Sequence, residues 1–377
     1  MLIGVDASRA AVPQRTGTEN YSLYLIRALL QEGAAHRFRL YFNGAPEPDL
    51  FPRSERVEWR VISFPRLWTH IRLAWEVARH PPDVLFVPAH VLPLVHPRHC
   101  VATVHDLGYL HYPEAHTPSA RRYLDWATRF NARVARRVIV DSEATRDDLA
   151  GCYGVDPAKM VVAYPAGAEG MQPVTDPVVL EQVRQRYGTG PRYFLYVGTI
   201  HPRKNLETLL RAFAAWVAEQ SSAAPQPQAA DVRLVIVGKQ GWLYEQILAL
   251  ARSLEVAERV VFTGYAPAED LPALLSGALA YVLPSWYEGF GLPVLEAMAC
   301  DTPVICSNVS SLPEVAGDAA LLFDPADVRA LTRALDQVCS DQQLRLRMIE
   351  RGRRQAQAFS WQRCAQQVLG ALVAAVG

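Results

Sequence analysis

The sequence predicts an α/β protein of two domains, each a parallel sheet covered by helices. Three observations carry this prediction. The chain has 377 residues, which is more than one ordinary hydrophobic core encloses. Short apolar runs that end in polar residues alternate with helical patterns, as buried parallel strands and their connecting helices do. This alternation stops near the middle of the chain and then starts again, which indicates a second domain.

The first half of the chain supplies the strands and helices of the first predicted domain, placed at residues 1–170. A strand at 2–7 leads into a helix at 20–30, and a further helix is expected at 119–136. Because strands and helices alternate, one parallel sheet with helices on both faces is expected. The other strands are expected at 38–43, 57–63, 84–87, 101–105, 138–141 and 160–164.

The second predicted domain, placed at residues 188–357, follows a linker. Residues 165–190 are rich in Gly, Pro and Val and show little periodicity, so the linker is expected there. The stretch 221–230, SSAAPQPQAA, is typical of a disordered surface loop. From Asp327 onward the pattern is helical. Strands are expected at 193–197, 234–237, 260–263, 281–283, 304–306 and 321–323.

Composition and charge exclude several classes of protein. Half of the residues are hydrophobic and 20% are charged, which is typical of a globular chain. The 38 basic residues balance the 38 acidic ones, so no nucleic-acid partner is expected. No signal peptide and no apolar run of about 18 residues is found, so no membrane span is expected. Six cysteines without a Cys-x-x-Cys pair are expected to be reduced thiols of a cytoplasmic protein.

The strongest functional signal is the stretch EGFGLPVLE at 288–296, between a predicted strand and a predicted helix. Gly289 and Gly291 allow the backbone to approach a ligand closely, and Pro293 suits the first turn of a helix. The N–H groups at a helix start attract anions, and a diphosphate is the natural occupant. The alternative is an ordinary loop and helix start with acidic neighbours.

Two carboxylates, Glu288 and Glu296, flank this helix start. They would repel phosphate groups, so they are expected to face something neutral. Sugar hydroxyls fit, because a carboxylate accepts hydrogen bonds worth about 1.5–3 kcal/mol each from a diol. The stretch therefore predicts a site for a molecule that carries both a diphosphate and sugar hydroxyls.

A second signal, VGTIHPRKN at 197–205, also lies between a strand and a helix. Arg203 and Lys204 offer cationic donors that could stabilise a departing diphosphate; the alternative is a solvated basic helix start. Weaker signals follow two other strands, where the dipeptide at 238–239 and the turn at Thr263 could line a nucleotide pocket or could be plain turns.

The first half carries two weaker candidates and a basic helix. Gly17 follows the first strand and could bring a backbone N–H to phosphate, although a plain turn is equally compatible. His105 ends a strand and could donate a hydrogen bond to a substrate, although a lone histidine is often structural. Six arginines are expected on one helix with apolar residues between them, which is typical of contact with an anionic membrane surface or a phosphorylated acceptor; the alternative is a solvated face over a buried apolar stripe. These arginines are Arg121, Arg122, Arg129, Arg133, Arg136 and Arg137.

Together these motifs resemble the retaining glycosyltransferases of family 4, and the resemblance covers nearly the whole chain. The pair Glu288 and Glu296 is similar to the E-x7-E motif of that family. The resemblance implies the GT-B fold, in which two Rossmann-like domains face each other across a cleft and the last helix, at about 358–377, packs back on the first domain. It also implies that Glu296 holds the ribose of a nucleotide-sugar donor and that Glu288 lies near the transferred sugar.

The same resemblance implies the other site roles. Lys204 matches a phosphate-binding lysine, and His105 matches a histidine near the reacting centre. This chain has Thr199 where many members carry arginine, so Arg203 is expected to supply that charge. The expected catalytic residues are His105, Glu288, Arg203 and Lys204, and the expected donor contacts are Gly17, Thr199, Arg203, Lys204, Thr263, Glu288, Gly289, Phe290, Gly291, Leu292 and Glu296.

The function implied is transfer of a hexosyl residue, with retained configuration, to a glycan or lipid-linked acceptor. GDP-mannose is the first donor candidate, and UDP-glucose or UDP-N-acetylhexosamine are alternatives. No Asp-x-Asp pair is present, so no metal and no cofactor are expected. The expected location is the cytoplasm, either free or peripheral on the inner face of the membrane. Two rival classes are a dinucleotide oxidoreductase, which lacks its Gly-x-Gly-x-x-Gly here, and a non-catalytic sugar-nucleotide-binding protein.

Overall fold

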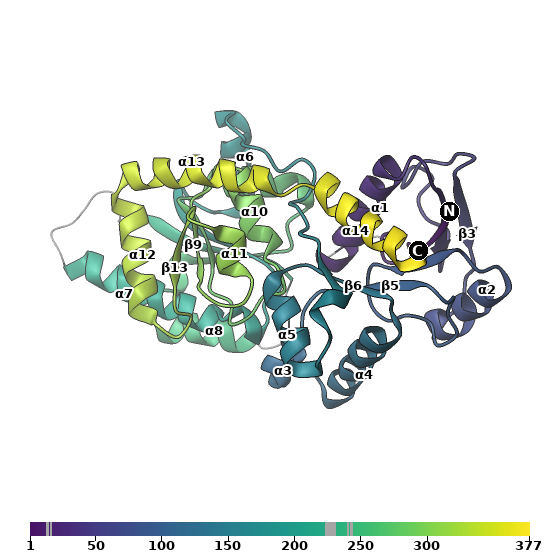
Figure 1. Ribbon diagram of the computed structural model, residues 1–377. Coiled ribbons are helices and arrows are strands. Elements are labelled where there is room, and N and C mark those ends of the chain that lie inside the picture. Colours follow the sequence, from purple (N-terminus) through teal and green to yellow (C-terminus); the bar gives the residue numbers. More distant parts are fainter. Residues whose placement is uncertain (13–14, 16, 223–230, 240, 242–243) are drawn as a thin grey trace. The chain divides into compact units, whose positions relative to one another are not determined.

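The structure is a computed structural model that describes residues 1–12, 15, 17–222, 231–239, 241 and 244–377. The chain divides into two compact units, Met1–Ala166 with Phe359–Gly377 and Gly167–Ala358. Each unit holds one sheet, labelled in Figure 1, in which every described neighbouring pair of strands runs parallel. The predicted fold class, two Rossmann-like α/β domains, is therefore confirmed.

The sheet of the first unit has the order β3-β2-β1-β4-β5-β6-β7. The order reverses between β1 and β4, which is the doubly wound arrangement that leaves room for ligands at the carboxyl ends of the strands. The strands are β1 (Leu2–Asp6), β2 (Arg37–Phe42), β3 (Val57–Val61), β4 (Val84–Val87), β5 (Cys100–Val104), β6 (Arg137–Val140) and β7 (Met160–Val162).

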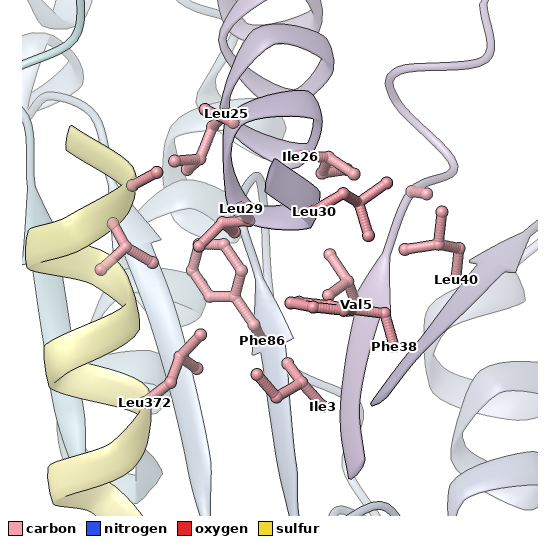
Figure 2. Close-up of a cluster of buried hydrophobic side chains, with 14 of the residues drawn as sticks. Ile3, Val5, Leu25, Ile26, Leu29, Leu30, Phe38, Leu40, Phe86 and Leu372 are labelled. Atoms are coloured by element: carbon pink, nitrogen blue, oxygen red, sulfur yellow. The ribbon is translucent and has the colours of Figure 1, made fainter. Parts of the chain in front are cut away.

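Helices cover both faces of this sheet, because successive side chains of a strand point to opposite faces. In β4, Phe86 packs with α1 and α14 on one face, while Leu85 packs with α2, α4 and α5 on the other. Figure 2 shows Leu372 of α14 close to Phe86 and to Leu29 of α1. The helices are α1 (Gly17–Glu32), a π-helix (Thr69–Leu73) that continues into α2 (Ala74–Arg79), α3 (Gly108–His111), α4 (Pro118–Val134), α5 (Glu143–Tyr153) and α14 (Trp361–Val376).

The sheet of the second unit has the order β10-β9-β8-β11-β12-β13, again with a reversal, here between β8 and β11. Its strands are β8 (Arg192–Val197), β9 (Val232–Val237), β10 (Val260–Gly264), β11 (Ala280–Leu283), β12 (Val304–Ser307) and β13 (Ala320–Phe323). Its helices are α6 (Pro177–Tyr187), α7 (Leu206–Ser222), α8 (Tyr244–Ser253), α9 (Leu271–Ser276), α10 (Leu292–Ala299), α11 (Leu312–Ala316), α12 (Val328–Ser340) and α13 (Gln342–Ala358).

The prediction of an unpatterned linker over 165–190 is wrong where the chain forms α6. The side chain of Asp176 accepts the N–H of Val178, Pro177 occupies the first turn, and Gly188 ends the helix at a φ of 62°. These residues are ordinary signals for the start and end of a helix. The Gly and Pro residues that suggested a linker include Pro177 and Gly188. The second unit therefore already contains α6, and the division between the units falls after Ala166.

The predicted basic helix is shorter than expected. The side chain of Thr117 accepts the N–H of Ala120 at its start, and α4 ends at Val134. Arg136 lies in the following turn and Arg137 begins β6, so the prediction that these two arginines share the helix is wrong. Of the loop predicted at 221–230, residues 221 and 222 end α7, and the remainder lies outside the described residues.

Among the described residues, no helix combines the length and the apolarity that crossing a bilayer requires.

Candidate functional site

The Gly-rich stretch connects β11 to α10 in the second unit, as its sequence predicts. Gly291 has a φ of 107°, and a Cβ there would lie 2.7 Å from the Leu312 side chain, so only glycine fits. Gly291 is also the N-cap of α10, and no side chain in the described part of the chain caps this helix. The N–H groups of Gly291 and Leu292 therefore lie at the positive end of a helix that no side chain of the described residues caps.

Glu288 lies at the start of this stretch and forms an ion pair with Lys204. The Lys204 Nζ donates to Glu288 Oε1 at 2.5 Å, and the Ser285 hydroxyl donates to the same oxygen at 2.6 Å. Lys204 ends a short 3-10 turn (Pro202–Lys204) that follows β8, and β8 is the neighbour of β11 in the sheet. The sheet order thus brings together two residues that are far apart in the sequence.

The electrostatics of this pair favour the charged form of both partners. Burial alone would raise the pKa of Glu288, but the charges of Lys204 and Arg203 and the hydrogen bonds from Lys204 and Ser285 outweigh burial and hold this pKa below its usual value. Glu288 is therefore ionised at neutral pH. The protein itself therefore supplies a countercharge to this carboxylate, which the sequence alone did not predict.

Glu296 occupies the second turn of α10 and faces the start of the second unit. Its Oε1 accepts the N–H of Ala168 at 3.3 Å, and a Cβ on Gly167 would lie 3.4 Å from its Cγ. Burial raises the pKa of Glu296, and the hydrogen bond from Ala168 only partly opposes this effect. A half-buried carboxylate with a raised pKa is a common feature of ligand sites.

The other donor residues expected in the second unit lie at the ends of β8 and β10. The loops after β8 and β9 touch backbone to backbone, since a Cβ on Gly238 would lie 1.9 Å from Gly198 O. Thr199, in the first of these loops, is exposed. The carbonyl of Arg203 accepts the N–H of Trp286 at 2.9 Å, so Arg203 is next to the Gly-rich stretch. Thr263 instead donates its hydroxyl to the carbonyl of the following glycine at 2.9 Å.

Gly17 and His105 belong to the first unit. Gly17 begins α1, and one turn later the Tyr21 ring lies edge-on to His105 with the ring centroids 4.7 Å apart. His105 follows β5 directly, as expected. Its Nδ1 is 2.6 Å from Asp141 Oδ2, and its Nε2 is 3.0 Å from Pro88 O. Both ring nitrogens therefore have protein partners, and a substrate hydroxyl at Nε2 would replace the Pro88 carbonyl.

These contacts set the charge of His105. Burial by itself lowers the pKa of this histidine, but the charge and hydrogen bond of Asp141, the charge of Asp106 and the Pro88 carbonyl outweigh burial and raise it above the usual value. A carbonyl oxygen only accepts hydrogen bonds, so Nε2 carries a proton. The structure thus favours an imidazolium held between two oxygens.

Sequence reasoning missed the residues that hold the candidate side chains in place within each unit. Asp141 follows β6 as His105 follows β5, and two polar residues directly after consecutive buried strands were a readable signal. Ser310 and Ser311 had no such signal, because the sheet order sets their partners, whereas Ser285 lies only three residues before its partner Glu288. In the described part of the chain, no three His, Cys, Asp or Glu side chains gather in the way a metal ion needs.

Comparisons with known proteins show which protein families this chain matches. Residues 181–355 match the family described as Glycosyl transferases group 1, and residues 15–166 match Glycosyltransferase Family 4. The O-antigen chain mannosyltransferase B of Escherichia coli is 32% identical over 374 residues, which cover 94% of this chain and 95% of that protein. This similarity extends through both units.

Two solved structures show the same fold. Sucrose-phosphate synthase from Thermosynechococcus elongatus superposes with a TM-score of 0.74 at 22% identity, over 98% of this chain and 97% of that one. HepE from Anabaena, solved in complex with UDP and glucose, superposes with a TM-score of 0.74 at 18% identity, over 99% of both chains.

Two Rossmann-like units and a Gly-rich helix start between two glutamates define a glycosyltransferase with the GT-B fold. Given the match to the Escherichia coli enzyme along nearly all of both chains, the protein belongs to glycosyltransferase family 4 and resembles bacterial mannosyltransferases.

The His105–Asp141 pair gives a first prediction. Replacing Asp141 with Asn should lower the pKa of His105, because the charge and the hydrogen bond of Asp141 then no longer oppose the effect of burial. NMR titration of the histidine rings measures this, with the His105→Gln variant to assign the signal. The raised pKa in the wild type contributes stability that is complete below about pH 6.5 and is lost as pH rises through the folded pKa. An unchanged titration of His105 in Asp141→Asn would contradict the assigned pairing.

Proposed function

We propose that this protein transfers a hexosyl residue, with mannose from GDP-mannose as the first candidate, to a glycan or a lipid-linked acceptor in polysaccharide or glycoconjugate biosynthesis. The observation that carries the proposal is the uncapped start of α10 beside Lys204, between Glu288 and Glu296. Similarity to an O-antigen mannosyltransferase supports mannose. The UDP bound by HepE supports UDP-glucose or UDP-N-acetylhexosamine as the alternative donor.

The diphosphate of the donor would lie at the start of α10. The N–H groups of Gly291 and Leu292 and the helix dipole favour an anion there. An ammonium group has three N–H donors, and Glu288 Oε1 takes one donor of Lys204, which leaves others for phosphate oxygens. With Arg203 close by, these groups would stabilise charge on the departing diphosphate without a metal ion.

The reaction we propose retains the configuration at the anomeric carbon. The bond from this carbon to the phosphate oxygen breaks, the acceptor oxygen bonds on the same face, and the departing phosphate oxygen takes the acceptor proton. The Glu288 carboxylate is engaged by Lys204 and Ser285 and is suited to electrostatic support rather than covalent attack. Trapping a glycosyl adduct on the enzyme in high yield would overturn this route.

A panel of donors tests the proposal. Release of GDP or UDP measures the hydrolysis of GDP-mannose, UDP-glucose and UDP-N-acetylglucosamine. GDP-mannose should react fastest. Glu296→Gln should raise the donor KM by about tenfold or more, since charge-assisted hydrogen bonds to the ribose are lost. The control Glu350→Gln changes an exposed carboxylate on α13 of the same unit and should leave the KM unchanged.

The pH dependence of the donor KM tests the same role of Glu296. Because burial raises the pKa of Glu296, the wild-type KM should begin to rise with falling pH above the ordinary carboxyl range of about 4.3. Glu296→Gln should lack this step. Hydrolysis of no donor by the folded protein, or an unchanged KM in Glu296→Gln, would contradict the proposed function.

We further propose that the protein is cytoplasmic and contacts an anionic membrane surface through its first unit. Exposed apolar side chains recur every four residues along the segment that enters α2, at Leu67, Ile71 and Trp75. Tyr123 and Trp126 of α4 are also exposed, and the Trp126 ring lies 5.7 Å from that of His70 in the π-helix, so the two elements adjoin.

Arginines lie against the aromatic side chains of this surface, and the carboxylate near Arg72, that of Glu76, is buried. The guanidinium groups of Arg72 and Arg79 lie 4.8 and 5.0 Å from the centre of the Trp75 ring. On α4, Asp125 is paired with Arg129 at 3.0 Å, so it offers little opposing charge. Aromatic side chains among arginines are typical of proteins that lie on anionic lipid surfaces.

Vesicle binding tests this contact. The double variant Trp75→Ser with Trp126→Ser should bind phosphatidylglycerol vesicles at least about tenfold more weakly than the wild type in co-sedimentation, while donor hydrolysis is preserved. The matched control is Val178→Ser with Leu346→Ser, two exposed apolar residues of the second unit. Equal binding of the variant and the wild type, or equal binding of phosphatidylcholine vesicles, would refute the membrane contact.

A further inference from the structure

Two serines lie behind the Gly-rich stretch and bind its backbone. Ser310 and Ser311 belong to the loop between β12 and α11, next to β11 in the sheet. The Ser310 hydroxyl accepts the N–H of Glu288 at 2.9 Å. The hydroxyl of Ser311, which is fully buried, lies 2.7 Å from Phe290 O and 3.0 Å from Glu288 O, and its single O–H is shared between these two carbonyls. Three backbone groups of the stretch are thus held by two neighbouring side chains.

These hydrogen bonds fix the direction of the peptide planes. In a planar trans peptide, the C=O of one residue and the N–H of the next point in opposite directions. Ser311 draws the carbonyls of Glu288 and Phe290 toward itself, so the N–H groups of Gly289 and Gly291 point away from it. Gly291 is the N-cap of α10, where the anion would lie. The Ser311 hydroxyl therefore fixes the orientation of the peptide bond between Phe290 and Gly291.

The backbone of Ser310 adopts a conformation that opposes its residue type. Its φ is 49°, in the left-handed region that residues other than glycine rarely adopt. Such conformations persist where the surroundings hold them, and they gather at functional sites. Here the left-handed residue lies directly before Ser311 and carries the hydroxyl that binds Glu288, so the unfavourable conformation coincides with the contacts to the Gly-rich stretch.

We propose that Ser311, supported by Ser310, is a positioning residue for the donor diphosphate. It acts through the backbone: it orients the N–H of Gly291 at the start of α10, and that N–H binds the phosphate. This inference rests on the proposed function, because it takes a nucleotide diphosphate as the ligand. It adds that diphosphate recognition, and not recognition of the nucleoside, depends on a buried hydroxyl outside the E-x7-E stretch.

Binding of GDP, UDP, guanosine and uridine by isothermal titration calorimetry tests this role. Ser311→Ala should weaken the preferred nucleoside diphosphate by about tenfold, the equivalent of one charge-assisted hydrogen bond, and should leave the affinity for its nucleoside unchanged. The matched control is Ser307→Ala, which removes a fully buried hydroxyl that donates to Leu283 O at 3.4 Å within the sheet. It should leave both affinities unchanged.

A second variant separates positioning from stability. Ser310→Gly relieves the left-handed backbone and removes the hydroxyl that accepts the Glu288 N–H. It should keep or raise the melting temperature and yet weaken diphosphate binding severalfold, a combination that a purely structural serine would not give. This variant keeps the inference testable if Ser311→Ala fails to fold.

The outcomes distinguish this inference from the proposed function. If the wild type binds neither GDP nor UDP, the proposed function is overturned and the inference with it. If the wild type binds one of them and Ser311→Ala, or Ser310→Gly in its place, keeps full diphosphate affinity, only the positioning role is overturned. Parallel loss of nucleoside and diphosphate affinity would also overturn it, because that result indicates general damage to the site.

Discussion

Lys204 and Glu288 follow neighbouring strands, β8 and β11, and their charges meet where both side chains are mostly shielded from water. A carboxylate buried alone would be costly, and the ammonium of Lys204 with the Ser285 hydroxyl offsets that cost. The pair ties the Gly-rich stretch to the turn after β8. This contact fixes Glu288, which lies three residues before Gly291, the N-cap of α10. The start of α10 therefore keeps the position in which it can hold an anion.

Both units use one arrangement at the carboxyl ends of their sheets. In the first unit, His105 follows β5 and is held by Pro88 after β4 and by Asp141 after β6. In the second, Glu288 follows β11 and is held by Lys204 after β8 and by Ser310 after β12. In each case a charged residue after a central strand is contacted from both neighbouring strands, for His105 through its ring and for Glu288 through its carboxylate on one side and its backbone N–H on the other. This is the rigid support that binding and catalytic groups need.

The fold and the main site were readable from the sequence because their signals are local. Strand and helix patterns repeat over a few residues, and EGFGLPVLE is contiguous, so both units and the helix start could be predicted. The contacts that orient the site depend on which strands are neighbours, which local patterns do not fix. The hydroxyls of Ser310 and Ser311 were missed for this reason, whereas Asp141 directly follows a predicted strand, as His105 does, and could have been found. Helix α6 was missed differently: its boundary residues, Asp176 and Gly188, were interpreted as a linker.

A double-mutant cycle measures the contact on which this account depends. Lys204→Met and Glu288→Gln each remove one charge and keep the side-chain shape, and the free energy of unfolding is measured in urea for both single variants and the double variant. Each single variant should lose about 3 kcal/mol, because it leaves a buried partner without its countercharge. The double variant should lose about 1–3 kcal/mol less than the sum. Losses that add to within about 0.5 kcal/mol would show that the two charges do not support each other and would contradict the account.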